Sequence, residues 1–247
     1  MDDDQPGDTH WFEPVADHLG EAYLRYSFTK GTAAEVAFLV EELGLRPGTR
    51  VLDVGCGPGR HAHALAAQGV EVVGVDISQR FIDLARATAP SGATFVRGDA
   101  RDLAYDTEFD AAYSLCQGAF GLLGGPAAGP GGPEDGAVLA GMARAVRPGG
   151  GIVVSAFSAY FQVRHLEGDT FDAANGTNHE VSEVVDADGR PATVDLWTTC
   201  FTPRELRLLA DAAGIAVSGI YSGTPGRYGR TSPNIDDEEF LLVGRRR

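Results

Sequence analysis

The sequence is poor in the features that mark secreted, membrane-bound or disulfide-stabilised chains. It has three cysteines, Cys56, Cys116 and Cys200, and their spacing shows no pairing. We therefore expect free thiols in a reducing compartment. No apolar run approaches the roughly 18 residues of a membrane span, and Met1 is followed by aspartates where a signal peptide would be basic. These shortages predict a cytoplasmic protein with no membrane association.

Basic residues are scarce as well. Lysine and arginine together number 20 against 35 aspartates and glutamates, and the formal net charge is −15. Such a charge repels phosphate backbones, so nucleic acid is not an expected partner. The basic run at residues 245–247 is interpreted as a solvated tail. The length of 247 residues suits one α/β domain that carries an insertion.

Glycines cluster directly after the first expected strand. Residues 51–54 form a short apolar run suited to a central parallel strand, where both faces are covered. Gly55, Gly57 and Gly59 follow, and they free the backbone for left-handed conformations and for close approach of a ligand. A helix over residues 61–68 comes next. A strand, a glycine-rich turn and a helix N-terminus together predict a cofactor cradle at the carboxyl edge of a sheet.

Two classes of cofactor suit such a cradle. The dinucleotide fingerprint Gly-x-Gly-x-x-Gly fits Gly55 and Gly57, but it requires a third glycine where Arg60 stands. The third glycine is Gly59 instead. Asp76 ends the next apolar run, about 20 residues further on, where a carboxylate can accept hydrogen bonds from both hydroxyls of a ribose. Asp76 alone would fit NAD and S-adenosylmethionine equally well.

Three later segments decide between these cofactors. Residues 93–97 predict a third strand with Asp99 after its exit, and residues 109–115 predict a fourth strand. A turn at residues 147–151 leads into a fifth strand. Together with the run from Asp53 to Gly59, these segments resemble the motifs of the class I S-adenosylmethionine-dependent methyltransferases over residues 33 to 160. The alternatives are a cofactor-binding sensor or scaffold without turnover and an NAD-dependent oxidoreductase.

The resemblance implies a Rossmann-like α/β fold with S-adenosylmethionine as cofactor and S-adenosylhomocysteine as product. It predicts a mostly parallel sheet of seven strands in the order 3-2-1-4-5-7-6, with helices on both faces. It also implies the following cofactor-binding residues: Tyr23, Asp53, Gly55, Cys56, Gly57, Asp76, Ile77, Asp99, Ala100, Leu115 and Cys116.

These residues have different implied roles. The backbone of Gly55 and Gly57 would meet the methionyl part, and Asp53 would orient the loop or contact the amino group through water. Asp76 would hold the ribose. The adenine would lie against Ile77, with Asp99 and Ala100 at its edge. Leu115 and Cys116 would line the methionine end, and Gln117 and Phe120 would face the acceptor.

Two segments outside these motifs are expected to complete the site. Residues 1–32 would form an N-terminal helical lid, with Tyr23, Tyr26 and Lys30 over the cofactor; the alternative is a helix packed on the domain edge. Residues 33–247 would form the methyltransferase domain. Within it, residues 158–201 would insert an antiparallel hairpin about Asp186 to Gly189, because Asp-Gly is a strong hairpin signal. This hairpin would wall the substrate site, or lie at an edge away from it.

The reaction itself needs few fixed residues. Methyl transfer from a sulfonium requires alignment, exclusion of water and, for some acceptors, removal of a proton. The segment after the fourth strand lacks the Asn-Pro-Pro-Tyr-type motif of amide and adenine methylators, so we expect transfer to an oxygen or nitrogen of a small molecule. The candidates for proton transfer are His18, His165, His179 and Tyr26. No metal is expected, and a homodimer is possible.

Overall fold

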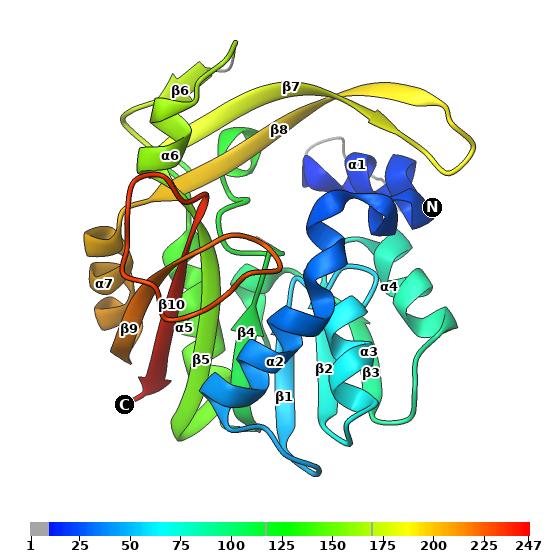
Figure 1. Cartoon of the computed structure of the whole chain (residues 1–247), viewed down its shortest axis with the longest axis vertical. Coiled ribbons are helices and arrows are strands. Elements are labelled where there is room, and N and C mark those ends of the chain that lie inside the picture. Colours follow the sequence, from blue (N-terminus) through cyan, green and yellow to red (C-terminus); the bar gives the residue numbers. More distant parts are fainter. Residues whose placement is uncertain (1–9, 117, 169) are drawn as a thin grey trace.

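The computed structural model describes residues 10–116, 118–168 and 170–247. It is a sheet covered by helices on both faces, with a second layer above one edge of the sheet (Figure 1). The helices are α1 (Phe12–Leu19), α2 (Thr32–Leu43), α3 (Arg60–Ala66), α4 (Gln79–Ala87), α5 (Asp135–Ala145), α6 (Ala159–Arg164) and α7 (Pro203–Ala212). Short 3₁₀ helices are η1 (Gly20–Arg25), η2 (Ser27–Gly31), η3 (Ala100–Asp102) and η4 (Gly125–Ala127). In these described parts, no helix is long and apolar enough to cross a bilayer.

The strands are β1 (Arg50–Val54), β2 (Glu71–Asp76), β3 (Ala93–Arg97), β4 (Phe109–Ser114), β5 (Val146–Ser158), β6 (Thr170–Asp172), β7 (Thr177–Val185), β8 (Pro191–Phe201), β9 (Ile215–Gly223) and β10 (Glu239–Arg246). Strands β3-β2-β1-β4-β5 lie side by side and parallel. β10 pairs antiparallel with both β5 and β9. If β9 and β10 are counted as strands six and seven, this is the predicted order 3-2-1-4-5-7-6, which is therefore confirmed.

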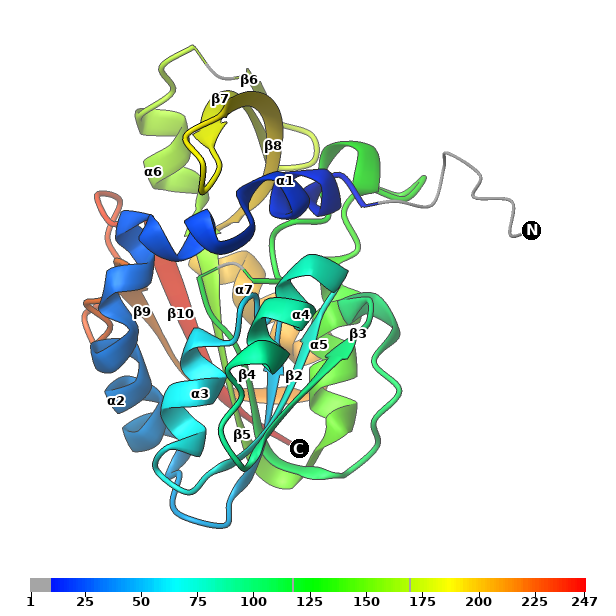
Figure 2. The ribbon, with the colours of Figure 1, turned by 90° about the vertical axis from the view of Figure 1, so that its right-hand side faces the viewer.

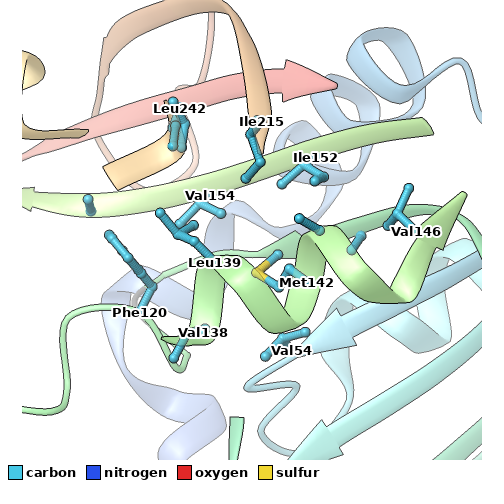
Figure 3. Close-up of a cluster of buried hydrophobic side chains, with 14 of the residues drawn as sticks. Val54, Phe120, Val138, Leu139, Met142, Val146, Ile152, Val154, Ile215 and Leu242 are labelled. Atoms are coloured by element: carbon cyan, nitrogen blue, oxygen red, sulfur yellow. The ribbon is translucent and has the colours of Figure 1, made fainter. Parts of the chain in front are cut away.

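The sheet buries a separate apolar cluster on each face. α5 and α7 cover one face, where Leu139 and Met142 pack against Val54, Ile152 and Val154 of the strands (Figure 3). α2, α3 and α4 supply the cluster on the other face (Figure 2). The side chains of β1 contribute alternately to the two clusters, because successive side chains of a strand point to opposite faces of the sheet. These two cores fix the strand tips from which the site is built.

Local sequence signals set several element boundaries. The Ser78 side chain accepts a hydrogen bond from the Phe81 amide and caps α4. Thr202 and Glu205 form a capping box at the start of α7. The expected turn before the fifth strand differs from prediction. β5 already begins at Val146, and residues 147–150 bulge out of its pairing with β4 before the register resumes.

The inserted hairpin is formed by β7 and β8, with β6 as a third strand. The end of β8 pairs with the end of β5, so the hairpin rises from the carboxyl edge of the sheet. It then arches over α1, as both views show (Figures 1 and 2). Val15 and Leu19 of α1 pack against Val184 of β7 in a small third cluster. The hairpin and the N-terminal helices thus form one layer above the strand tips.

Candidate active site

The glycine-rich loop after β1 has the backbone conformation that its sequence predicts. Gly55, Gly57 and Gly59 have φ values of +74°, +52° and +83°. A Cβ on Gly55 would lie 2.0 Å from the carbonyl carbon of Gly118, so only glycine fits there. A Cβ on Gly57 would meet only a Tyr23 ring carbon at 3.9 Å. The Gly57 backbone therefore faces open space in which a ligand can approach it.

Asp76 stands at the tip of β2 beside this loop. Its carboxylate accepts hydrogen bonds from the amides of Gly57, at 2.7 Å, and Ser78, at 2.9 Å. The residue is 5% exposed, and burial raises its pKa to about 6, against the lowering effect of these two amides. Each carboxylate oxygen can accept more than one hydrogen bond. Asp76 therefore has capacity left for a hydroxyl-bearing ligand.

Two cavities meet at this point. The smaller lies at the tips of β2 and β3 and spans about 400 Å³, open solvent at its mouth included, and Ile77, Asp99 and Ala100 are among the residues that line it. The larger spans about 1150 Å³, again with open solvent included. Both are lined by Gly55 and Asp76. Phe12, Gly118 and Leu122 line both cavities as well, so a molecule that reaches from one cavity into the other lies among these five residues.

Asp99 is held by its neighbour Arg101. The Arg101 Nε lies 3.0 Å from each Asp99 carboxylate oxygen, and the Arg101 amide donates to the same side chain. Burial alone would raise the pKa of Asp99, but these contacts outweigh it and hold the pKa below its ordinary value. His10 lines the same cavity, which the sequence reasoning did not anticipate. Burial, with Arg101, lowers the pKa of His10.

The larger cavity lies between the sheet edge and the upper layer. Its lining residues are mostly apolar and come from α1, η1, the loop after β4, the hairpin and the start of β10: Trp11, Phe12, Val15, Leu19, Tyr23, Tyr26, Gly55, Gly57, Asp76, Phe81, Cys116, Gly118, Leu122, Phe157, Val184, Leu196, Thr198, Pro225, Glu238 and Glu239. The hairpin therefore borders the cavity. Trp11 belongs to the predicted N-terminal lid segment, whereas Phe157 and Glu239 had no signal in the sequence, because only the folded chain brings them to the cavity.

Three of the expected cofactor residues lie in the core rather than on a described cavity wall. Asp53 is 1% exposed, and burial raises its pKa to about 7 although Tyr113 and Arg60 act in the opposite direction. Cys56 and Leu115 are buried in the cluster beneath α2 and α3. Asp53 lies two residues before the glycine loop and Cys56 lies within it, so these buried side chains are placed to support the loop.

Cys116 does reach the larger cavity, with a φ of +52° that is uncommon for a residue other than glycine. Its Sγ lies 2.8 Å from Arg60 Nη2, and burial raises the pKa of the thiol. Arg60 also donates a hydrogen bond to the Glu35 carboxylate, which forms a second hydrogen bond with the His61 ring. Glu35, His61 and Cys116 offer metal-ligand atoms within 4.8 Å of one another. The Arg60 guanidinium among them already supplies the positive charge that a metal would bring.

The other N-terminal candidates divide into two groups. Tyr23 and Tyr26 line the larger cavity, and the Tyr23 ring packs on Phe81 with centroids 4.8 Å apart. The Tyr26 hydroxyl accepts a hydrogen bond from the Val185 amide of the hairpin, at 3.5 Å. Lys30 is exposed. The tyrosines thus lie where a lid requires them, and Lys30 faces solvent.

The candidate histidines lie outside the described linings of both cavities. His18 contacts a carbonyl oxygen near the hairpin turn, and His165 is exposed after α6. His179 stacks on Trp197 and lies 2.6 Å from Asp195 on the hairpin. Of the residues expected to face the acceptor, Gln117 lies outside the described residues. Phe120 is fully buried and stacks on Phe201.

Known proteins share these features. The family described as "Methyltransferase domain" matches residues 51–150, which include β1, the glycine loop, Asp76 and Asp99. The cypemycin N-terminal methyltransferase of a Streptomyces species is 31% identical over 200 residues, which are 72% of this chain and 78% of the relative. The chain belongs to the class I S-adenosylmethionine-dependent methyltransferases.

Two further similarities span nearly the whole of this methyltransferase. The dTDP-3-amino-3,6-dideoxy-alpha-D-glucopyranose N,N-dimethyltransferase of Streptomyces fradiae is 27% identical over 255 residues, covering 88% of this chain and 96% of the relative. The solved structure of CalS10, an amino pentose methyltransferase from Micromonospora echinaspora with S-adenosylmethionine bound, shares the fold with a TM-score of 0.63. It is 24% identical and covers 91% of this chain and 95% of that one.

S-adenosylmethionine is the methyl donor of this family, and the site geometry is compatible with it. The open face of Gly57 leaves room for an extended ligand. Asp76, at the tip of β2, lies where the two cavities meet. This arrangement suits a ligand made of a nucleoside joined to an amino acid, with one part in each cavity. With the family known, the interpretations as an oxidoreductase and as a scaffold without turnover are set aside.

Proposed function

We propose that this methyltransferase binds the nucleoside of S-adenosylmethionine in the smaller cavity and a small-molecule acceptor in the larger one. Asp76 would hold the ribose, Ile77 and Ala100 would contact the adenine, and the backbone of Gly55 and Gly57 would meet the methionyl part. The bound cofactor supplies an electrophilic methyl group on a positively charged sulfur. The observation that carries the proposal is the shared border of the two cavities at Gly55 and Asp76.

The acceptor atom in this proposal is an oxygen or a nitrogen. Both curated relatives described above carry names that place their methylation on nitrogen, which supports the second choice. The upper layer would serve this reaction directly. Residues 10–32 and the hairpin would cover the larger cavity and keep water from the transferring group. We also propose a cytoplasmic location, because Cys56, Cys116 and Cys200 are all free.

Calorimetric titration with S-adenosylhomocysteine tests the cofactor assignment. We expect Asp76→Ala to weaken binding at least about tenfold, because a charged acceptor of two hydroxyl hydrogen bonds is lost. Since Asp76 also holds the Gly57 amide, Asp76→Asn provides a variant of the same size, and thermal melting reports whether each variant folds. The control is Asp83→Ala, an exposed carboxylate on α4. Unchanged affinity in folded Asp76 variants would contradict the proposal.

A further inference from the structure

The charged residues that line the larger cavity are all acidic. They are Asp76, Glu238 and Glu239, and the described lining contains no lysine, arginine or histidine. A cavity of this charge disfavours carboxylates and phosphates and attracts cations. In the proposed function Asp76 is occupied by the cofactor ribose. The other two carboxylates line the part of the cavity that the proposed function gives to the acceptor, and they differ in burial: Glu238 is exposed, whereas Glu239 is 2% exposed.

Glu239 reaches the site because β10 runs against its neighbours. The first residue of an antiparallel strand lies at the same edge as the last residues of the parallel strands beside it. Glu239 accordingly pairs with Phe157 at the end of β5 and with Gly223 at the end of β9. Because β10 is antiparallel to β5, its first residue, Glu239, lies at the edge of the sheet where the glycine-rich loop also lies.

Neighbouring side chains hold this carboxylate close to the exit of β4. The Tyr228 hydroxyl donates to Glu239 Oε2 at 2.8 Å, and the same hydroxyl lies 3.6 Å from Cys116 Sγ. Cys116 in turn lines the cavity together with Gly55 and Gly57. One tyrosine hydroxyl therefore links the Glu239 carboxylate to Cys116, and both residues line the cavity that also borders the loop assigned by the proposed function to the methionyl part of the cofactor.

The remaining walls define the other half of the acceptor. Val15 and Leu19 of α1 pack against Val184 of the hairpin, and Trp11 and Leu196 pack against the same cluster. All five residues are apolar and line the cavity on this side. An apolar or aromatic body would bury its surface against them. Inside such walls a charge pair is weakly screened and correspondingly strong.

On the basis of the proposed function, we propose that Glu239 selects an acceptor that carries a protonated amine on an apolar body. The ammonium group would pair with the Glu239 carboxylate while the body lies against the apolar wall that α1 and the hairpin form together. An ammonium nitrogen must lose one proton before its electron pair is free. The carboxylate in contact with it is placed to take that proton, which leaves a neutral amine and a protonated Glu239.

Three matched probes test this selection: 4-phenylbutylamine, 4-phenylbutanol and 4-phenylbutyrate, which carry the same body with a cation, a neutral group or an anion. Each is titrated into the protein saturated with S-adenosylhomocysteine. The readouts are calorimetry and tryptophan fluorescence, which comes from Trp11 in the cavity wall and from Trp197. We expect the amine to bind at least about tenfold more tightly than the other two. Equal affinities, or no binding of the amine, would overturn the proposal.

Variants then assign the selectivity to one residue. Glu239→Gln keeps the shape of the side chain but removes its charge, and we expect it to weaken amine binding about tenfold or more while the alcohol is unaffected. Glu71→Gln, an exposed residue at the far end of β2, is the matched control. A loss in Glu238→Gln instead would contradict the choice of Glu239. S-adenosylhomocysteine affinity, measured on the same samples, tests the proposed function separately.

Discussion

At the scale of single residues, the site depends on close backbone contacts that leave no room for a side chain. The loop after β1 and the loop after β4 touch at Gly55 and Gly118, where a Cβ on Gly118 would lie 2.1 Å from the Gly55 carbonyl oxygen. This contact holds the loop after β4, which carries Cys116 and lines the larger cavity, against the glycine-rich loop. The pKa values of the acidic residues nearby are shifted in opposite directions. Burial raises the pKa of Asp53 and Asp76, whereas hydrogen-bonded and charged partners lower the pKa of Glu35.

Gly55→Ala should therefore be costly for two reasons, a φ of +74° and a clash with Gly118. We expect a loss of about 2–4 kcal/mol in the free energy of unfolding, measured by urea denaturation. Gly48→Ala is the control, since Gly48 has a φ of +83° but nothing within 4 Å of its missing Cβ. It should cost only the backbone strain, about 1 kcal/mol. Similar losses in the two variants would show that the contact with Gly118 is not tight.

At the scale of elements, Glu35 joins three segments that are far apart in the sequence. It lies on α2, accepts hydrogen bonds from Arg60 and the Gly226 amide, and pairs with His61. Burial would raise the pKa of Glu35, but His61 and Arg60 outweigh it and lower the pKa to about 2. The lowered pKa means that the ionised form stabilises the fold, and that this contribution is lost as pH falls from about 4.5 towards 2.

Glu35→Gln should leave the Arg60 charge buried without a charged partner. We expect a loss of about 3–5 kcal/mol at pH 7. Below pH 4.5 the unfolded chain binds a proton on Glu35, whereas the folded protein does so only near pH 2, so the difference between the two proteins should shrink between these values. Urea denaturation at pH 7 and at about pH 3 measures both values. A difference that stays constant with pH would mean that the substitution disrupts packing rather than removing a charge interaction.

Local patterns predicted the elements better than they predicted the cavity. The strands from β1 to β4 each follow from a few adjacent residues, and the Ser78 cap and the Thr202 capping box are equally local in the structure. The strand order followed from the resemblance. By contrast, Trp11 and Glu239 line one cavity from opposite ends of the chain. Their proximity depends on the reversed direction of β10 and on the packing of α1 under the hairpin, and no adjacent residues encode either.

At the scale of the whole molecule, the protein consists of two layers with the cavity between them. The sheet and its helices bury two large clusters, whereas α1 and the hairpin share only the small one around Val15, Leu19 and Val184. Fewer buried apolar contacts imply a lower local free energy of opening. The upper layer should therefore open without unfolding of the sheet, which would give ligands access to the cavity.

The same leucine-to-alanine substitution, made once in each layer, tests whether the two layers unfold separately. Leu139→Ala, in the core beneath α5, should cost about 2–5 kcal/mol in global unfolding. Leu19→Ala removes the same atoms from the small cluster, and both leucines are buried, at 0% and 5% exposed. We expect Leu19→Ala to lower the global value by less than half as much. In hydrogen exchange it should instead accelerate the amides of α1 and of β7 and β8 near Val184, while those of β1 and β4 stay protected. Equal global losses, with exchange raised uniformly across the chain, would show that the two layers unfold as one unit.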